Sequence, residues 1–147
     1  MTVKDSQKSI LDYIYTLLTS DATLKAAMGG TVRLFHTVAT PDAEFPYLVN
    51  RLDIRSTGFF PNQISTYYLD IWSDNPDSNA EVLPIRKRIL ELIDELQFDT
   101  TECVNGKIWK DNADGFIPEP EPNIWHYAMQ FNLRFYRKSE TSVIISR

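Results

Sequence analysis

Apolar and polar positions follow a helical period at the start of the chain. Residues 3–18 place Ile10, Ile14 and Leu18 four positions apart, which forms one apolar stripe. Ser20 or Asp21 can cap a short second helix, which the pair Gly29-Gly30 would end. The pattern therefore predicts two consecutive helices.

The next part of the chain changes to the composition of strands. Residues 32–37, 47–55 and 63–72 are rich in β-branched and aromatic side chains and predict three strands. Pro46 has no N–H and can open a strand, so the preceding loop should bring Phe45 and Tyr47 to the rim of a sheet. A short turn region, residues 56–62, joins the second and third strands, so we expect antiparallel pairing.

A long amphipathic helix is predicted over residues 80–96, after a loop rich in Asn and Asp. Pro84 lies in its first turns and indicates either a later start or a small kink. Asn105-Gly106 is a strong hairpin signal and should precede a strand at residues 108–110. The proline-rich residues 118–123 should form an extended connection across one end of the sheet.

The last strand, residues 125–137, is the clearest element. Its apolar side chains all fall on one parity: Trp125, Tyr127, Met129, Phe131, Leu133 and Phe135. Such alternation is typical of a half-buried strand. The whole pattern predicts the α+β class, with a single twisted, mostly antiparallel β-sheet and helices packed on one face. We expect one domain, residues 1–137, followed by a C-terminal arm, residues 138–147.

Composition narrows the classes of function. A chain of 147 residues fits one domain. Its net charge is −5, whereas most nucleic-acid-binding proteins carry an excess of basic residues. Cys103 is the only cysteine, so no disulfide forms within the chain. Neither a signal peptide nor an apolar run of about 18 residues is apparent, so we expect a soluble protein, made or assembled inside a cell, without a membrane partner.

Candidate chemistry is sparse. His36 and His126 have no partners at the spacing of a metal site, and Cys103 has no second cysteine nearby. Asp70, Asp74 and Asp77 lack the glycine and glutamate of a calcium loop, and turn or capping roles explain the last two better. We therefore expect no catalytic residue, no metal and no cofactor, with His126 either solvated or hydrogen-bonded on the polar face of its strand.

Three segments are candidates for protein contacts. Consecutive phenylalanines in the 56–62 turn cannot both point inward from extended backbone, although a bend could bury both. The basic triplet 86–88 could meet an acidic partner or be a solvated helix face. The apolar end of the arm could add to a sheet edge of this chain or of a neighbour. The candidate interface residues are Phe59, Phe60, Arg86, Arg88, Val143, Ile144 and Ile145.

Four segments in a fixed order carry a resemblance to a known family. They are the first helix with Asp21–Leu24 and Gly29-Gly30, residues 32–35 followed by 45–49, residues 67–72 before the Asn/Asp-rich loop and long helix, and the final strand ending in Phe135-Tyr136-Arg137. In this order and length the chain resembles the tail terminator (tail completion, head–tail joining) proteins of long-tailed bacteriophages. Residues 118–122 and the arm have no counterpart in the resemblance.

The resemblance implies a non-enzymatic virion protein that is assembled in the host cytoplasm. Such a protein forms a ring, typically hexameric, on the head-proximal end of the tail tube, ends tube polymerisation and presents a surface to the head connector. Its partners would be its own copies, the tail tube protein and the connector, with DNA only passing through the lumen. Two alternatives stay open: a neck or connector protein, and a small intracellular enzyme whose pocket would gather His36, His126, Cys103 or acidic residues.

Overall fold

The computed structural model describes residues 6–55, 62–100, 102–111 and 114–137. Its elements in chain order are α1 (Ser6–Thr19), α2 (Ala22–Ala27), β1 (Leu34–His36), β2 (Tyr47–Arg55), β3 (Asn62–Ser73), α3 (Ser78–Ile93), β4 (Leu96–Phe98), β5 (Cys103–Lys110), β6 (Gly115–Ile117) and β7 (Trp125–Arg137). The long strands β2 and β7 have the predicted bounds, and β3 extends one residue further at each end.

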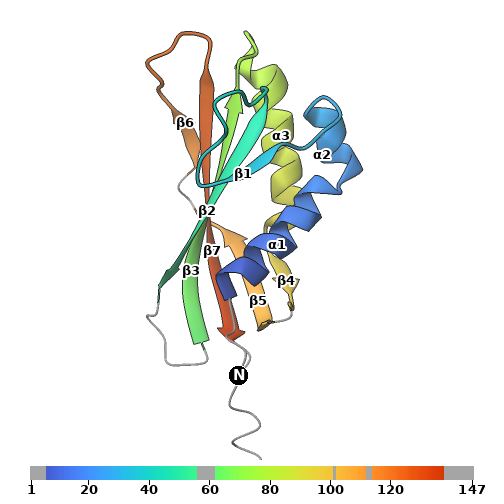
Figure 1. Ribbon diagram of the computed structural model, residues 1–147, viewed down its shortest axis with the longest axis vertical. Coiled ribbons are helices and arrows are strands. Elements are labelled where there is room, and N and C mark those ends of the chain that lie inside the picture. Colours follow the sequence, from blue (N-terminus) through green and yellow to red (C-terminus); the bar gives the residue numbers. More distant parts are fainter. Residues whose placement is uncertain (1–5, 56–61, 101, 112–113, 138–147) are drawn as a thin grey trace, which may run out of the picture.

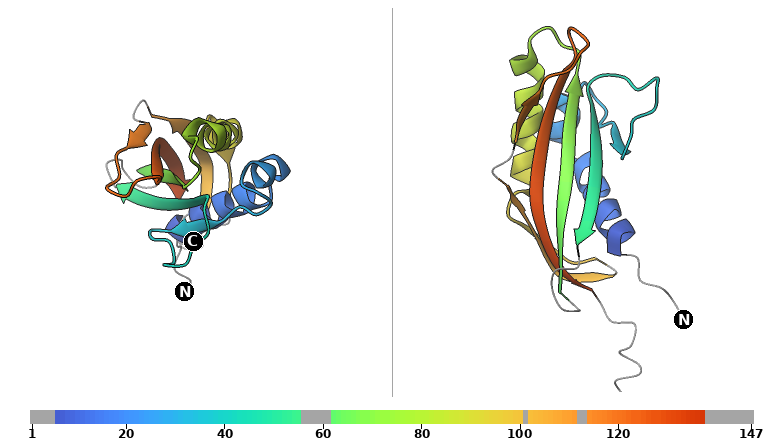
Figure 2. Two further views of the ribbon diagram at one scale, coloured as in Figure 1. Left: turned by 90° about the horizontal axis from the view of Figure 1, so that it is seen from above. Right: turned by 90° about the vertical axis from the view of Figure 1, so that its left-hand side faces the viewer.

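The strands form one seven-stranded sheet with the order β1-β2-β3-β7-β5-β4, and β6 pairs with β7 beyond the end of β5. β1 is parallel to β2, whereas every other pairing in the described sheet is antiparallel. The predicted fold class is confirmed, because the sheet is twisted and mostly antiparallel and the helices cover one of its faces (Figures 1 and 2).

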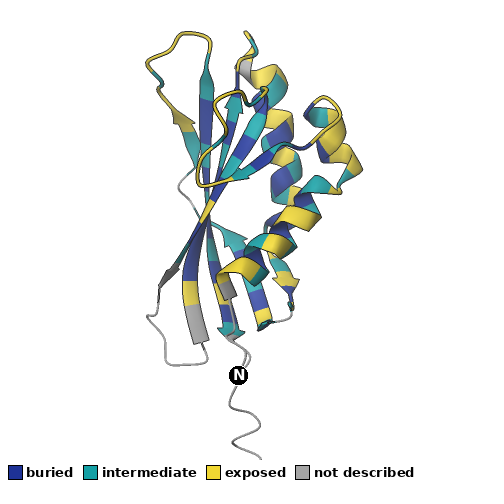
Figure 3. Cartoon of the chain, in the orientation of Figure 1, coloured by how far each residue is buried: buried dark blue, intermediate teal, exposed yellow. Residues whose placement is uncertain are grey.

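The core lies between this face and the helices, where buried residues of both layers meet (Figure 3). Ile10, Ile14 and Leu18 of α1 are fully buried, as the stripe predicts. The alternation in β7 is also confirmed, because Met129, Phe131, Leu133 and Phe135 point into the core. The side chains of opposite parity on β2, β3 and β7 consequently line the face that carries no helix.

Helix ends follow the predicted signals. The Asp21 carboxylate accepts a hydrogen bond from the backbone N–H of Leu24 at 2.8 Å and caps α2. Gly29 and Gly30 have φ values of 84° and 113°, which a glycine adopts without a steric penalty, and the chain leaves the helix there. Asp77 caps α3 through the N–H of Asn79.

Some predicted elements were wrong in detail. Asn105-Gly106 makes no hairpin: both residues lie inside β5, at a register shift between Val104 and Lys107. α3 begins before Pro84, at Ser78, so this proline does not mark a later start. α3 ends at Ile93 rather than at residue 96, and the chain then forms the short strand β4, which the pattern does not predict.

Candidate interaction surface

The helix-free face of the sheet carries a row of aromatic side chains at one end. Register places Tyr47 of β2, Trp72 of β3 and His126 of β7 side by side, and Ile117 of β6 completes the row. The Trp72 ring stacks on His126 with 3.9 Å between ring centroids, and Tyr47 lies 6.2 Å from Trp72 on the other side. As predicted, Phe45 joins Tyr47 at the rim, with its ring centroid 5.1 Å away.

His126 is the polar centre of this row. Its Nε2 lies 2.8 Å from Asp70 Oδ2, and its Nδ1 lies 2.8 Å from Glu119 Oε1 in the loop between β6 and β7. Burial opposes the charged form, but the two carboxylates outweigh it and raise the pKa of His126 above 6.5. The hydrogen-bonded alternative predicted for this residue is therefore the one observed.

Arg33 fixes the loop that leads into the row. Its guanidinium donates to the backbone carbonyls of Glu44, Pro46 and Phe45 at 3.0, 3.1 and 3.3 Å. These bonds hold residues 44–46 where Phe45 and Tyr47 reach the aromatic row. The sequence contains no local signal for this role, because the acceptors are main-chain atoms.

Three loops lie at the end of the sheet that carries the aromatic row, and together they make an acidic end. They are residues 37–46, 74–77 and 118–124, which follow or precede strands that end in the same row of the sheet. None of the three contains Lys or Arg, whereas they carry the carboxylates of Asp42, Glu44, Asp74, Asp77, Glu119 and Glu121. Most residues of these loops are exposed at the upper end of the molecule (Figure 3).

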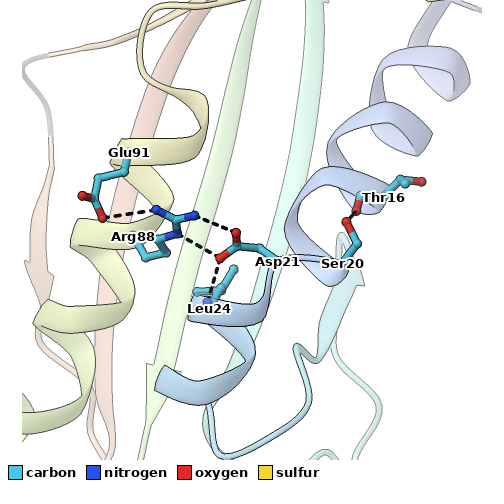
Figure 4. Close-up of polar contacts among 6 residues, drawn as sticks. All are labelled: Thr16, Ser20, Asp21, Leu24, Arg88 and Glu91. Atoms are coloured by element: carbon cyan, nitrogen blue, oxygen red, sulfur yellow. Dashed lines mark hydrogen bonds and ion pairs between the residues drawn. The ribbon is translucent and has the colours of Figure 1, made fainter.

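Both arginines of α3 are engaged within the chain. Arg88 makes two hydrogen bonds to the carboxylate of Asp21, at 2.7 and 2.9 Å, and lies 3.7 Å from Glu91 (Figure 4). The pKa of Asp21 is lowered to about 2, chiefly by this bond from Arg88. Arg86 likewise pairs with Asp114 at 2.9 Å. Lys87 between them is exposed.

The other predicted interface residues lie outside the described part of the chain. Phe59 and Phe60 belong to residues 56–61, and Val143, Ile144 and Ile145 belong to residues 138–147. Their role stays a prediction.

His36, His126 and Cys103 do not share a site. His36 Nδ1 lies 2.6 Å from Asn50 Oδ1, and Asn50 in turn donates to the buried hydroxyl of Tyr67. Cys103 is buried and pairs in register with Arg137, at the opposite end of β7 from His126 and roughly 35 Å away at the rise of a strand. The two histidines and the cysteine therefore form no common pocket.

One groove runs along the outer side of α1. It has a volume of about 690 Å³, is lined at one end by Thr100 and Glu102, and contains neither histidine nor cysteine. Among the described residues, no group of three His, Cys, Asp or Glu side chains could hold a metal ion. None of the helices described is long and apolar enough to cross a membrane.

Comparison with known proteins identifies the fold. No protein-family model and no curated protein matches the chain. A solved structure described as "Virion of native gene transfer agent (GTA) particle" contains a chain that is similar to this one with a TM-score of 0.71 and 12% sequence identity. The match covers 91% of this chain and 99% of that chain. At this identity the likeness shows that the two chains share a fold from end to end.

Proposed function

We propose that the protein is a structural component of a phage-like virion, and that within it the protein is the ring-forming terminator of the tail tube. One observation carries the coarser statement: a single chain of a virion particle has this fold over nearly its whole length. The order of elements that resembles the tail terminator family supports the finer one.

The two layers of the molecule suit a ring. Helices cover one face of the sheet (Figure 1), whereas the other face presents aromatic and charged side chains. A contact between unlike surfaces is head-to-tail, and head-to-tail contacts close into rings when the rotation per subunit permits. A ring subunit that docks on the tube but offers the next tube subunit no matching surface ends the polymer.

The experiment combines the protein with the tail tube protein of the same virion. Light scattering after size exclusion gives the mass of the protein alone and in the mixture, and electron microscopy gives the lengths of assembled tubes. We expect a ring, typically a hexamer, at one tube end, and shorter tubes as its concentration rises. A protein that stays monomeric and leaves tube length unchanged would refute the terminator role.

Adding the head connector to the same mixture separates the neighbouring alternative. A neck or connector protein would bind the head connector and leave the tube protein free.

Variants test the predicted contacts: Phe59→Ser with Phe60→Ser, and a chain ending at Arg137, should weaken ring formation. Lys87→Gln is the control variant and removes one positive charge from α3. Its side chain is exposed, whereas the neighbouring Arg86 and Arg88 are held by carboxylates.

A further inference from the structure

The contacts of His126 define its protonation state. A neutral imidazole has one N–H donor, and its other ring nitrogen accepts. Here both ring nitrogens lie 2.8 Å from a carboxylate oxygen, one from Asp70 and one from Glu119. A carboxylate accepts but does not donate, so a neutral ring would leave one contact between two acceptors. Both contacts are satisfied together when the ring is an imidazolium.

The surroundings of the ring favour this charge. The Trp72 ring lies parallel to His126 at 3.9 Å, so its π face covers the cation. On the far side of Trp72, burial and the carboxylates of Glu119 and Glu121 raise the pKa of Tyr47. The loop itself, residues 118–124, brings no lysine or arginine.

The two carboxylates come from separate parts of the fold. Asp70 is on β3 in the middle of the sheet, whereas Glu119 is in the loop that connects β6 to β7. This loop is exposed along most of its length, and alternate prolines at 118, 120 and 122 make it stiff. A stiff loop moves as a unit, so one bond from Glu119 can fix the position of the whole segment on the sheet.

We propose that His126 is a pH-sensitive latch, which holds residues 118–124 against the sheet as an imidazolium and releases them when it loses its proton. The latch is a property of this fold and does not depend on the proposed role in a virion. Because the carboxylates raise the pKa of the folded state, the stabilisation is fully present below about pH 6.5 and is lost as the pH rises through the folded pKa.

Hydrogen exchange of the loop amides tests the latch. The prolines leave Glu119, Glu121, Asn123 and Ile124 as reporters. After correction for the intrinsic rate, we expect their protection to be constant below about pH 6.5, to fall by up to about tenfold per pH unit above it, and to level off beyond the folded pKa. Core amides of β7 serve as the internal reference. Protection that does not change with pH in the loop would overturn the proposal.

A matched pair of variants separates the latch from general charge effects. Glu119→Gln and Glu121→Gln remove the same charge from the same loop, but only Glu119 has a hydrogen bond to His126 among the contacts described. We expect Glu119→Gln to lower the His126 pKa, measured by NMR of the imidazole, and to flatten the pH dependence of loop exchange. Glu121→Gln should change both much less. Equal effects of the two variants, or a wild-type His126 that titrates at or below 6.5, would refute the latch.

Discussion

Two buried serines on β3 contribute differently to the stability of the fold. Ser73 Oγ donates to the Glu81 carboxylate and accepts from the N–H of Asn75, so it joins the end of β3 to the start of α3. Ser65 Oγ, in contrast, is the one buried side-chain polar atom in the described residues without a hydrogen-bond partner. Burial without a partner costs free energy that folding must overcome.

We therefore expect replacement by alanine to change the free energy of unfolding in opposite directions at the two serines. Ser65→Ala removes an unsatisfied group and should raise the free energy of unfolding by about 1 kcal/mol, whereas Ser73→Ala should lower it by about 1–2 kcal/mol. Urea unfolding with an unchanged m-value measures both. If Ser65→Ala destabilises the protein as much as Ser73→Ala does, the Ser65 hydroxyl has a partner in solution.

Gly106 is a residue whose role the sequence could not reveal. The Asn-Gly pair signals residues that adopt unusual backbone angles, and Asn105 does have a φ of 54°. The pair lies at a bulge within β5 and not at a turn. There Gly106 pairs with Phe98 of β4. A Cβ at Gly106 would come within 2.5 Å of the Phe98 ring. Packing against a strand that the pattern does not predict therefore explains the glycine.

At the level of elements, strong periodicity predicts helices and strands well, but it does not predict which residues of neighbouring strands pair. The stripe of α1 and the alternation of β7 were sufficient to find both elements, because each has one mostly buried apolar face. The aromatic row was missed because it depends on which residues pair. Tyr47 meets Trp72 through one exact hairpin register, and His126 meets Asp70 through a pairing of strands far apart in the chain.

The contact between α2 and α3 gives a prediction at this scale. The folded pKa of Asp21 is about 2, below its ordinary value of 3.8, because Arg88 binds the carboxylate. The pair therefore stabilises the fold above pH 3.8, and this contribution is lost as the pH falls toward 2. Arg88→Met should raise the Asp21 pKa toward 3.8, which carboxyl NMR measures, and its destabilising effect in urea should shrink between pH 4 and pH 2.

A second background separates the pair from the cap. Asn is as good an N-cap as Asp, so Asp21→Asn keeps the bond to the N–H of Leu24 and removes the charge. Arg88→Met in this background should cost little at any pH. A cost equal to that in the wild type would assign the effect to other contacts of Arg88, such as Glu91.

For the whole molecule, the acidic end makes the charge distribution uneven. The triple variant Asp42→Asn, Glu44→Gln and Glu121→Gln neutralises three exposed carboxylates at that end. The control Glu91→Gln, Glu95→Gln and Glu102→Gln changes the net charge equally but elsewhere. Because an anion-exchange resin binds the most charged face, the first variant should elute at lower salt than the control. Identical elution of the two variants would mean that the resin does not bind the acidic end in preference to the rest of the surface.

The sheet also restricts how copies of the protein can meet. Its outermost strands, β1, β4 and β6, have three residues each, and the long strands β3 and β7 have paired neighbours on both sides for much of their length, whereas β2 pairs with β1 only from Leu48 to Asn50. A newcomer that extended the sheet at the three short strands could form only a few main-chain hydrogen bonds. Short margins are a common protection against uncontrolled β aggregation. At these short strands, side chains rather than the backbone then decide which partner the molecule accepts.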